Sequence, residues 1–178
     1  MRFLILFSFI IFFISCGEEK INPVIDSTLT EVEIPSQESW NSKILFTEDG
    51  KLKAVLYSEH LRKFDDSKEI FLEGVKIDFY EEDGTKSSTL TSKKGKVDEG
   101  LKNMFAIDSV VAVSDSGVTL RTDELMWNNQ KRKITTDKFV TIISPDEEIK
   151  GYGFESDQSL DNYVIYNITY ITALKEEE

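Results

Sequence analysis

Residues 116–157, SGVTLRTDELMWNNQKRKITTDKFVTIISPDEEIKGYGFESD, decide the fold of this chain. A short turn opens the stretch and leads into a segment in which Val118 and Leu120 face one way and the polar residues between and after them face the other. Alternation with a period of two residues is typical of a strand with one buried face. A charged segment follows, and then the same series of parts returns. The stretch therefore predicts paired β-strands.

The turn-and-strand unit recurs along the chain. One copy covers residues 140–154, and looser copies cover residues 75–97 and 44–57. The looser copies contain Asp-Gly at positions 83–84 and 49–50, a dipeptide that favours a tight hairpin turn. Four hairpin-like units of roughly 30 residues, stacked in order, predict an all-β chain folded as a β-solenoid or an open jelly roll.

The remaining segments complete the expected domain. Residues 110–113 and 164–171 are apolar or aromatic almost throughout, which predicts strands covered on both faces or strands lying against a partner. Residues 60–66 suggest the one helical turn. We expect the β domain to cover residues 40–174 and a short charged tail to follow at 175–178.

The amino-terminal segment has the pattern of a secretory signal. Arg2 precedes an apolar run at residues 3–14, and small residues follow at Ser15 and Gly17. The run has 12 residues, which would span about 18 Å as a helix and fall short of the roughly 30 Å hydrocarbon core of a bilayer. We therefore expect a signal peptide over residues 1–15.

A cysteine follows the signal segment directly. Ser15 and Cys16 are similar to the end of the lipobox of bacterial lipoproteins, in which the thiol carries diacylglycerol and the chain is cut before the cysteine. This resemblance implies a lipid anchor at Cys16 and a polar tether over residues 16–39; the alternative is a plain signal peptide with an incidental cysteine. Several acyl chains together would hold the protein firmly on a membrane.

Composition limits the possible functions. The chain has 178 residues, of which 40% are hydrophobic and 30% charged, which fits one domain with a modest core. The net charge is −12, and loss of Arg2 with the signal peptide would leave 20 positive against 33 negative residues, or −13. Nucleic-acid binding and basic membrane-surface patches need the opposite sign, so we expect no nucleic-acid partner. A single cysteine excludes an internal disulfide.

No set of residues points to catalysis. His60 is the only histidine, and neither a nucleophile motif nor a phosphate-binding loop accompanies it. The acidic clusters at 65–66, 81–83 and 146–148 lack the spacing of calcium loops. We therefore expect no enzyme activity, no cofactor and no metal site.

Apolar residues recur at corresponding points of successive units. They form either an ordinary sandwich core or an open trough for hydrocarbon, with Trp40 and Trp127 as candidates for its rim. The candidate groove residues are Ile77, Phe79, Ile107, Val118, Leu120, Trp127, Ile142 and Phe154.

The motifs of residues 117–142 and 149–157 resemble the LptC family of periplasmic lipopolysaccharide-export proteins. The pattern G-x-x-L-x-T-x-x-L-x-W, then I-x-T-x-x-x-V, then I-x-G-x-G-F is carried here by Gly117, Leu120, Thr122, Leu125, Trp127, Ile134, Thr136, Val140, Ile149, Gly151, Gly153 and Phe154. The resemblance implies an open β-jelly roll. Related jelly rolls occur in the bridge protein and the outer-membrane translocon of the same pathway.

The resemblance also implies partners. Family members take lipopolysaccharide from an inner-membrane ABC transporter and pass it to a periplasmic bridge protein by pairing of edge strands. The edge residues would be Ile44, Phe46, Val164, Tyr166 and Ile168. Because lipopolysaccharide is anionic and this chain is acidic, we expect burial of acyl chains, rather than charge, to dominate its capture.

One feature departs from the family pattern. Well-known members have a transmembrane helix at the amino terminus, whereas this chain has the signal segment and Cys16. We therefore expect a periplasmic lipoprotein variant, anchored in the inner membrane. The competing class is a β-sandwich lipoprotein that binds a protein or a glycan and carries no lipid.

Overall fold

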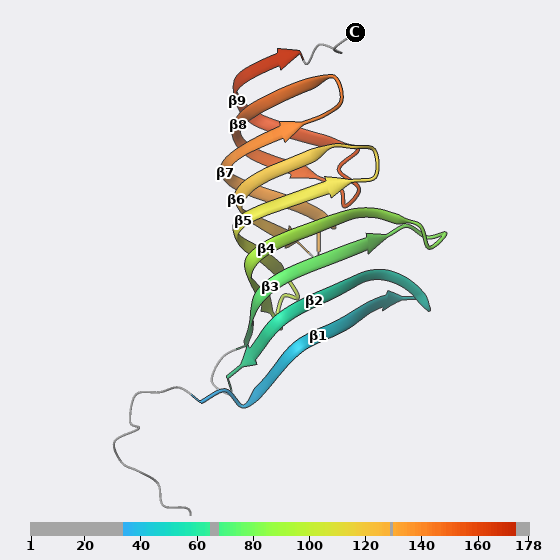
Figure 1. Ribbon diagram of the computed structural model, residues 1–178, viewed down its shortest axis with the longest axis vertical. Helices are drawn as coiled ribbons and strands as arrows, with labels where there is room; N and C mark the ends of the chain where they lie inside the picture. The colour runs from blue at the N-terminus through green and yellow to red at the C-terminus, as the bar shows by residue number, and fades with distance from the viewer. Residues whose placement is uncertain (1–33, 65–67, 129, 174–178) are drawn as a thin grey trace, which may run out of the picture. The chain divides into compact units, whose positions relative to one another are not determined.

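The computed structural model describes residues 34–64, 68–128 and 130–173, so the expected signal peptide, Cys16 and most of the tether lie outside the described residues. The described chain consists of nine β-strands (Figure 1). Their bounds are β1 Gln37–Glu48, β2 Lys51–Lys63, β3 Glu69–Tyr80, β4 Lys86–Asp98, β5 Met104–Ser114, β6 Thr119–Asn128, β7 Lys133–Ile143, β8 Glu147–Ser156 and β9 Tyr163–Ala173. The prediction of an all-β fold is confirmed.

The nine strands form one sheet in strict sequence order, and each pairs antiparallel with the next. The predicted turns connect them. Asp49 and Gly50 join β1 to β2 with φ angles of 51° and 76°, the left-handed values that a tight hairpin turn requires. Asp83 and Gly84 lie between β3 and β4, and the turn at residues 115–118 joins β5 to β6. Residues 144–146 join β7 to β8, so that these four turns produce the four predicted hairpins, with β9 as a ninth strand.

The pairing between most neighbouring strands shifts near the middle of the strands, and these shifts lie side by side across the sheet. The pairing of β5 with β6 shifts between Ile107 and Val110, and the neighbouring ladders of β4 to β8 shift at equivalent points. Left-handed φ angles mark the same places at Asn41, Gly74, Asp108, Ser109 and Gly153. Bulges of this kind bend a strand and increase its twist.

The aligned bends fold the sheet over, so that the two halves of each strand face one another across an interior (Figure 1). The fold is therefore an open β-jelly roll, as the sequence predicts. β1 pairs only with β2, and β9 pairs only with β8, so the described sheet has an unpaired edge at each end. We call these the β1 edge and the β9 edge.

Two local predictions are wrong. Residues 60–63 belong to β2 and form no helical turn, because Leu61 is buried and pairs with Ser39 and Leu72 in the two neighbouring strands. The segment at 164–171 is not covered on both faces: most of its side chains are exposed, and Ile171 retains 56% of its accessible surface. The alternative that this strand lies against a partner remains a prediction.

Candidate functional site: an apolar interior between the halves of the sheet

One row of side chains crosses the sheet from edge to edge. Its members occupy directly opposed positions in successive strands, and all of them are apolar. We call it the inner row: Ile44, Leu56, Ile77, Leu90, Ala112, Leu120, Ile142, Ile149 and Ile171. The seven middle residues are buried, whereas Ile44 is half-buried and Ile171 is exposed. The row therefore reaches both edges of the sheet without a polar interruption.

A second row, from the other halves of the strands, faces the inner row. It runs through Ile70, Val97, Met104, Trp127, Ile134, Ser156 and Tyr163. In β2 the row continues to Lys63, so it is largely apolar only from β3 onward. Ser156 is fully buried and donates its hydroxyl hydrogen to the Asn162 carbonyl oxygen at 3.2 Å. Because this hydroxyl has its own partner, the interior stays apolar between the two rows.

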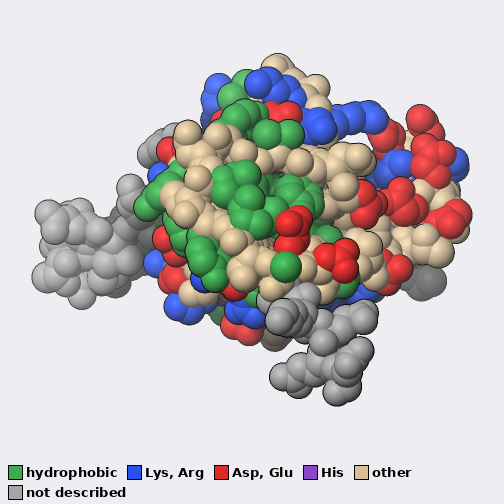
Figure 2. Space-filling model, turned by 90° about the horizontal axis from the view of Figure 1, so that it is seen from above, with side chains coloured by type: hydrophobic (Ala, Val, Ile, Leu, Met, Phe, Trp, Pro, Cys, Tyr) green, Lys and Arg blue, Asp and Glu red, His purple; other side chains and the backbone are tan. Residues whose placement is uncertain are grey.

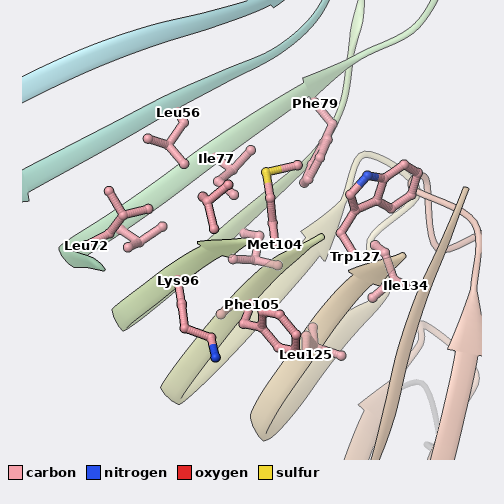
Figure 3. Close-up of a pocket in the computed structure, with 14 residues that line it drawn as sticks. Leu56, Leu72, Ile77, Phe79, Lys96, Met104, Phe105, Leu125, Trp127 and Ile134 are labelled. Carbon is pink, nitrogen blue, oxygen red and sulfur yellow. The ribbon is translucent and has the colours of Figure 1, made fainter. Parts of the chain in front are cut away.

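The two rows enclose a pocket behind the rim of the roll (Figure 3). In Figure 3 the Met104 side chain projects between Ile77 and Trp127. The pocket is lined by Leu56, Leu72, Val75, Ile77, Phe79, Leu90, Lys96, Val97, Met104, Phe105, Ala106, Leu125, Trp127 and Ile134. We call it the interior pocket. Its volume is about 30 Å³, which is room for one or two water molecules and far less than an acyl chain occupies.

Lys96 is the one charged residue in the lining of this pocket. Its Nζ lies 2.8 Å from Glu69 Oε1 and 4.9 Å from the centre of the Phe105 ring. Both partners hold the ammonium group, and its side chain is half-buried. The interior thus offers hydrocarbon contact and no free charge. Among the described residues, no group of three or more potential ligand side chains could hold a metal ion.

The structure separates the predicted groove residues into three groups. Ile77, Phe79 and Trp127 line the interior pocket. Leu120, Ile142 and Phe154 are buried in the core outside its lining, and Val118 packs against that core. Ile107 lies apart from the cluster: its neighbour Ala106 faces the interior, and Ile107 pairs with Lys94 and Glu124 in a polar row.

Sequence reasoning missed Leu56, Leu90, Met104 and Ile134. The signal for the first two was incomplete. The Asp49-Gly50 turn pairs Glu48 with Lys51, and a bulge between Phe46 and Thr47 then shifts the pairing by one residue, so that Ile44 opposes Leu56. A shift between Phe79 and Tyr80 likewise precedes the pairing of Ile77 with Leu90. Trp40 also differs from expectation. It lies outside the lining of the interior pocket, exposed near the β1 edge, and stacks on the His60 ring at 5.2 Å.

The candidate edge residues occupy the two ends of the sheet. Ile44 and Phe46 on β1 are half-buried against the core, whereas Val164, Tyr166 and Ile168 on β9 are exposed. Figure 2 looks onto the β9 end and shows hydrophobic side chains gathered in the middle of that face. An exposed apolar edge strand of this kind is a ready template for pairing with another strand.

No helix among the described residues is long and apolar enough to cross a membrane. In comparisons with known proteins, the family described as "Lipopolysaccharide-assembly, LptC-related" matches residues 3–170, almost the whole chain. A search of curated proteins gave no match.

Proposed function

The chain belongs to the LptC-related family of lipopolysaccharide-assembly proteins, and from this premise we propose that its apolar interior carries lipopolysaccharide acyl chains from one partner to the next. The family consists of lipopolysaccharide transport components that work in the periplasm in association with the inner membrane. Membership of this family therefore assigns the chain to lipopolysaccharide transport. The path that the lipid takes through this chain is what we propose.

The observation that carries the proposal is the inner row. A sandwich core normally ends before the edges of its sheets, where polar residues meet solvent, but the inner row continues to Ile44 and Ile171. Burial of hydrocarbon contributes about 0.8 kcal/mol per CH₂ group and has no preferred direction. An apolar row that reaches both edges can therefore hold acyl chains and let them slide from one module to the next.

In this proposal the two edges meet different partners. One edge takes lipopolysaccharide from the inner-membrane ABC transporter, whose ATPase supplies the energy, and the other passes it to a β-jelly-roll bridge protein. Strand addition at the β1 and β9 edges would align the inner row with the interiors of the neighbouring modules. The exposure of Ile168 and Ile171 supports this, because both side chains would be covered by a strand added beyond β9.

The membrane attachment is part of the same proposal. Acylation of Cys16, in the pattern Ser15-Cys16-Gly17, would hold the domain at the inner membrane, where the transporter releases its substrate. The residues between Cys16 and β1, which begins at Gln37 rather than at the predicted residue 40, would keep the β domain within reach of that transporter. No enzymatic step is required of this chain.

A β-sandwich lipoprotein that binds a protein or a glycan is the second candidate. The small volume of the interior pocket favours it, since a sandwich that never opens would have a filled core. The two candidates differ in whether residues of the interior pocket ever touch lipid.

Photo-crosslinking in cells tests the choice. Benzoylphenylalanine in place of Phe79, which lines the interior pocket, should give adducts recognised by lipopolysaccharide antibodies. The same residue in place of the exposed Arg121 is the control and should give none. Adducts at position 121 and none at 79 would exclude the interior as the lipid path.

A further inference from the structure

Three consecutive basic residues lie at the end of the turn between β6 and β7 and at the first position of β7 in this acidic chain. Lys131, Arg132 and Lys133 follow Asn128, whose side-chain oxygen accepts a hydrogen bond from the Lys131 backbone N–H at 3.0 Å. Arg132 has a φ of 53°, a conformation unusual for a residue other than glycine. Among the described residues, no carboxylate lies within ion-pair distance of Lys131 or Lys133.

This basic turn adjoins the interior pocket. Trp127 and Ile134 oppose one another in the hairpin that the turn closes, and both line the pocket. Arg132 precedes Ile134 by two residues and so lies next to the pocket wall, whereas Lys131 lines a separate surface pocket together with Glu124, Asp137 and Glu155. An apolar wall beside the Arg132 guanidinium group matches the chemistry of an amphiphile that has acyl chains and an anionic head.

Arg132 also contacts the other half of the folded sheet, at the open side of the roll where the turns of the two halves come together. Its Nη2 donates a hydrogen bond to Glu48 Oε1 at the end of β1, 84 positions earlier in the chain. We call this contact the rim pair. The two side chains retain 70% and 47% of their accessible surface. An ion pair this exposed contributes about 0–1 kcal/mol, so a competing anion displaces it at little cost.

Two other hydrogen bonds connect the turns on the same side of the roll. One, from the Ser116 hydroxyl to Asp161 Oδ1 at 3.3 Å, is exposed, and the other is more firmly packed. Ser88 on β4 donates its hydroxyl hydrogen to the Gln158 carbonyl oxygen at 2.8 Å, and Leu160 in the same β8–β9 loop is buried in the core. Opening there would expose Leu160 to water, whereas parting of the rim pair exposes only side chains that are already largely solvated. The rim pair is therefore easier to separate than the contact between Ser88 and the β8–β9 loop.

We propose that Arg132, flanked by Lys131 and Lys133, binds a phosphate of the lipid head group and that this exchange of partners opens the interior pocket. The guanidinium group gives up the Glu48 carboxylate and takes two phosphate oxygens, an arrangement that suits its planar geometry. The rim then loses its link between β1 and the β6–β7 turn, and an acyl chain enters beside Trp127 and Ile134.

The small pocket volume requires some step of this kind, because an acyl chain cannot enter about 30 Å³ unless the walls move apart. Met104 lies between the walls and has a flexible side chain that can turn aside. This inference rests on the proposed function. It changes the expectation drawn from net charge, because the capture of an anionic lipid depends on the local charge at the entrance rather than on the −12 of the whole chain.

Binding of fluorescent lipid A to the full-length protein in detergent tests the proposal. Arg132→Gln should weaken binding of bisphosphorylated lipid A roughly three- to tenfold, as expected for the loss of one charge-assisted contact. Glu48→Gln should strengthen it, because it frees Arg132. Arg62→Gln is the matched control: Arg62 also pairs with a glutamate, Glu73, but lies elsewhere on the surface, and its removal should leave binding unchanged.

Two further measurements distinguish binding through the phosphates of lipid A from binding through its acyl chains alone and from binding of free phosphate. Dephosphorylated lipid A should bind the wild-type protein and the Arg132→Gln variant equally, and inorganic phosphate at the concentration of the lipid should not compete. Equal affinity of the wild-type protein for phosphorylated and dephosphorylated lipid A, or competition by inorganic phosphate, would overturn this inference while the transport function stands. Binding of neither lipid would instead overturn the proposed function.

Discussion

Gly151 on β8 lies so close to β9 that a β-carbon at this position would be 2.4 Å from the Asn167 carbonyl oxygen and 3.0 Å from the Ile168 α-carbon. Both contacts are with backbone, which cannot rotate away as a side chain can. Gly151 therefore permits the last strand to approach β8 at the register that places Ile168 opposite it. The position of the β9 edge depends on the absence of a side chain at residue 151.

Gly151→Ala should destabilise the domain, because the added methyl group forces β9 outward. Overpacking of this kind costs about 1–3 kcal/mol, and urea unfolding measures it directly. Gly100→Ala is the control. A β-carbon at position 100 meets only the Asp98 side-chain oxygen, at 3.2 Å, so its cost should be much smaller. Equal losses in the two variants would contradict the close approach described above.

Leu120→Ala should lower the free energy of unfolding by about 2–5 kcal/mol, the usual cost of a cavity in a packed core. Leu120 retains 1% of its accessible surface. Ile107→Ala should cost much less, since Ile107 lies outside the core cluster. Chemical denaturation of both variants tests whether Leu120 lies inside the core and Ile107 outside it. A larger loss for Ile107 would show that the inward and outward faces of β5 are reversed.

Asp78 should make stability depend on pH in the acid range. Burial raises the pKa of its carboxyl group, but hydrogen bonds from Thr89 and Lys76 and the positive charges of Lys76 and Lys86 outweigh burial and lower the pKa below the usual 3.8. A carboxyl group whose pKa is lowered on folding stabilises the protein above pH 3.8, and the contribution disappears as pH falls through the folded pKa.

Urea unfolding of the wild-type protein and of Asp78→Asn between pH 6 and pH 3 measures this contribution. The wild-type protein should be the more stable at pH 6, and the difference should shrink as the pH approaches 3. A difference that stays constant over the whole range would show that the Asp78 charge does not contribute to folding.

Under the proposed function, Ile168→Glu should abolish strand addition at the β9 edge and leave the fold intact, since Ile168 is half exposed and a charge on an edge strand opposes strand addition. Co-purification with the bridge protein and with the transporter from cells measures which partner is lost. Val113→Glu is the control, because Val113 is exposed on β5, which already has strands on both sides. Loss of co-purification in the control as well would indicate a general effect of added charge.

Cys16→Ala should prevent lipid attachment and release the protein from the membrane fraction. Metabolic labelling with a radioactive fatty acid should mark the wild-type protein and not the variant. Ser15→Ala keeps a small residue before the cysteine and should remain labelled. A labelled Cys16→Ala variant would overturn the proposed anchor.

The hairpins could be predicted because their turns depend on local chemistry. Asp49 and Gly50 adopt the left-handed angles of a tight turn whatever surrounds them, and such a turn sets the register of both strands. Alternation along residues 75–80 placed Ile77 and Phe79 on one face of their strand, and the structure has both in the interior. These residues line the interior pocket, so a part of the site was visible in the sequence.

The bends could not be predicted from the sequence, but the outward position of Ile107 could. Asp108 and Ser109 insert an irregularity of two residues into β5, which keeps the alternation in phase, so Ala106, Val110 and Ala112 all face the interior. Strict alternation counted back from Ala112 therefore places Ile107 in the outer, polar row, where the structure has it. The bends lie at Asn41, Gly74, Asp108, Ser109 and Gly153, mostly residue types that also form turns, so the sequence does not distinguish a bend within a strand from the end of a strand.

The proposed entrance of the lipid, beside Glu48 and Arg132, could not be predicted from the sequence either. Glu48 and Arg132 lie 84 positions apart, and only the folding of the sheet onto itself brings them together. A net charge of −12 also concealed the local excess of positive charge at residues 131–133. Sums over a whole chain carry no information about how charges are distributed on its surface.

The strict order of the nine strands has a consequence for biogenesis. A chain exported amino terminus first presents β1 and β2 before any later strand, and each new strand finds its hydrogen-bonding partner already in place. Folding of this kind involves only short loop closures, which is the topology associated with rapid folding. We expect the domain to assemble vectorially during secretion, with β9 as the last strand to join, so that the unpaired apolar edge forms only once the rest of the sheet is complete.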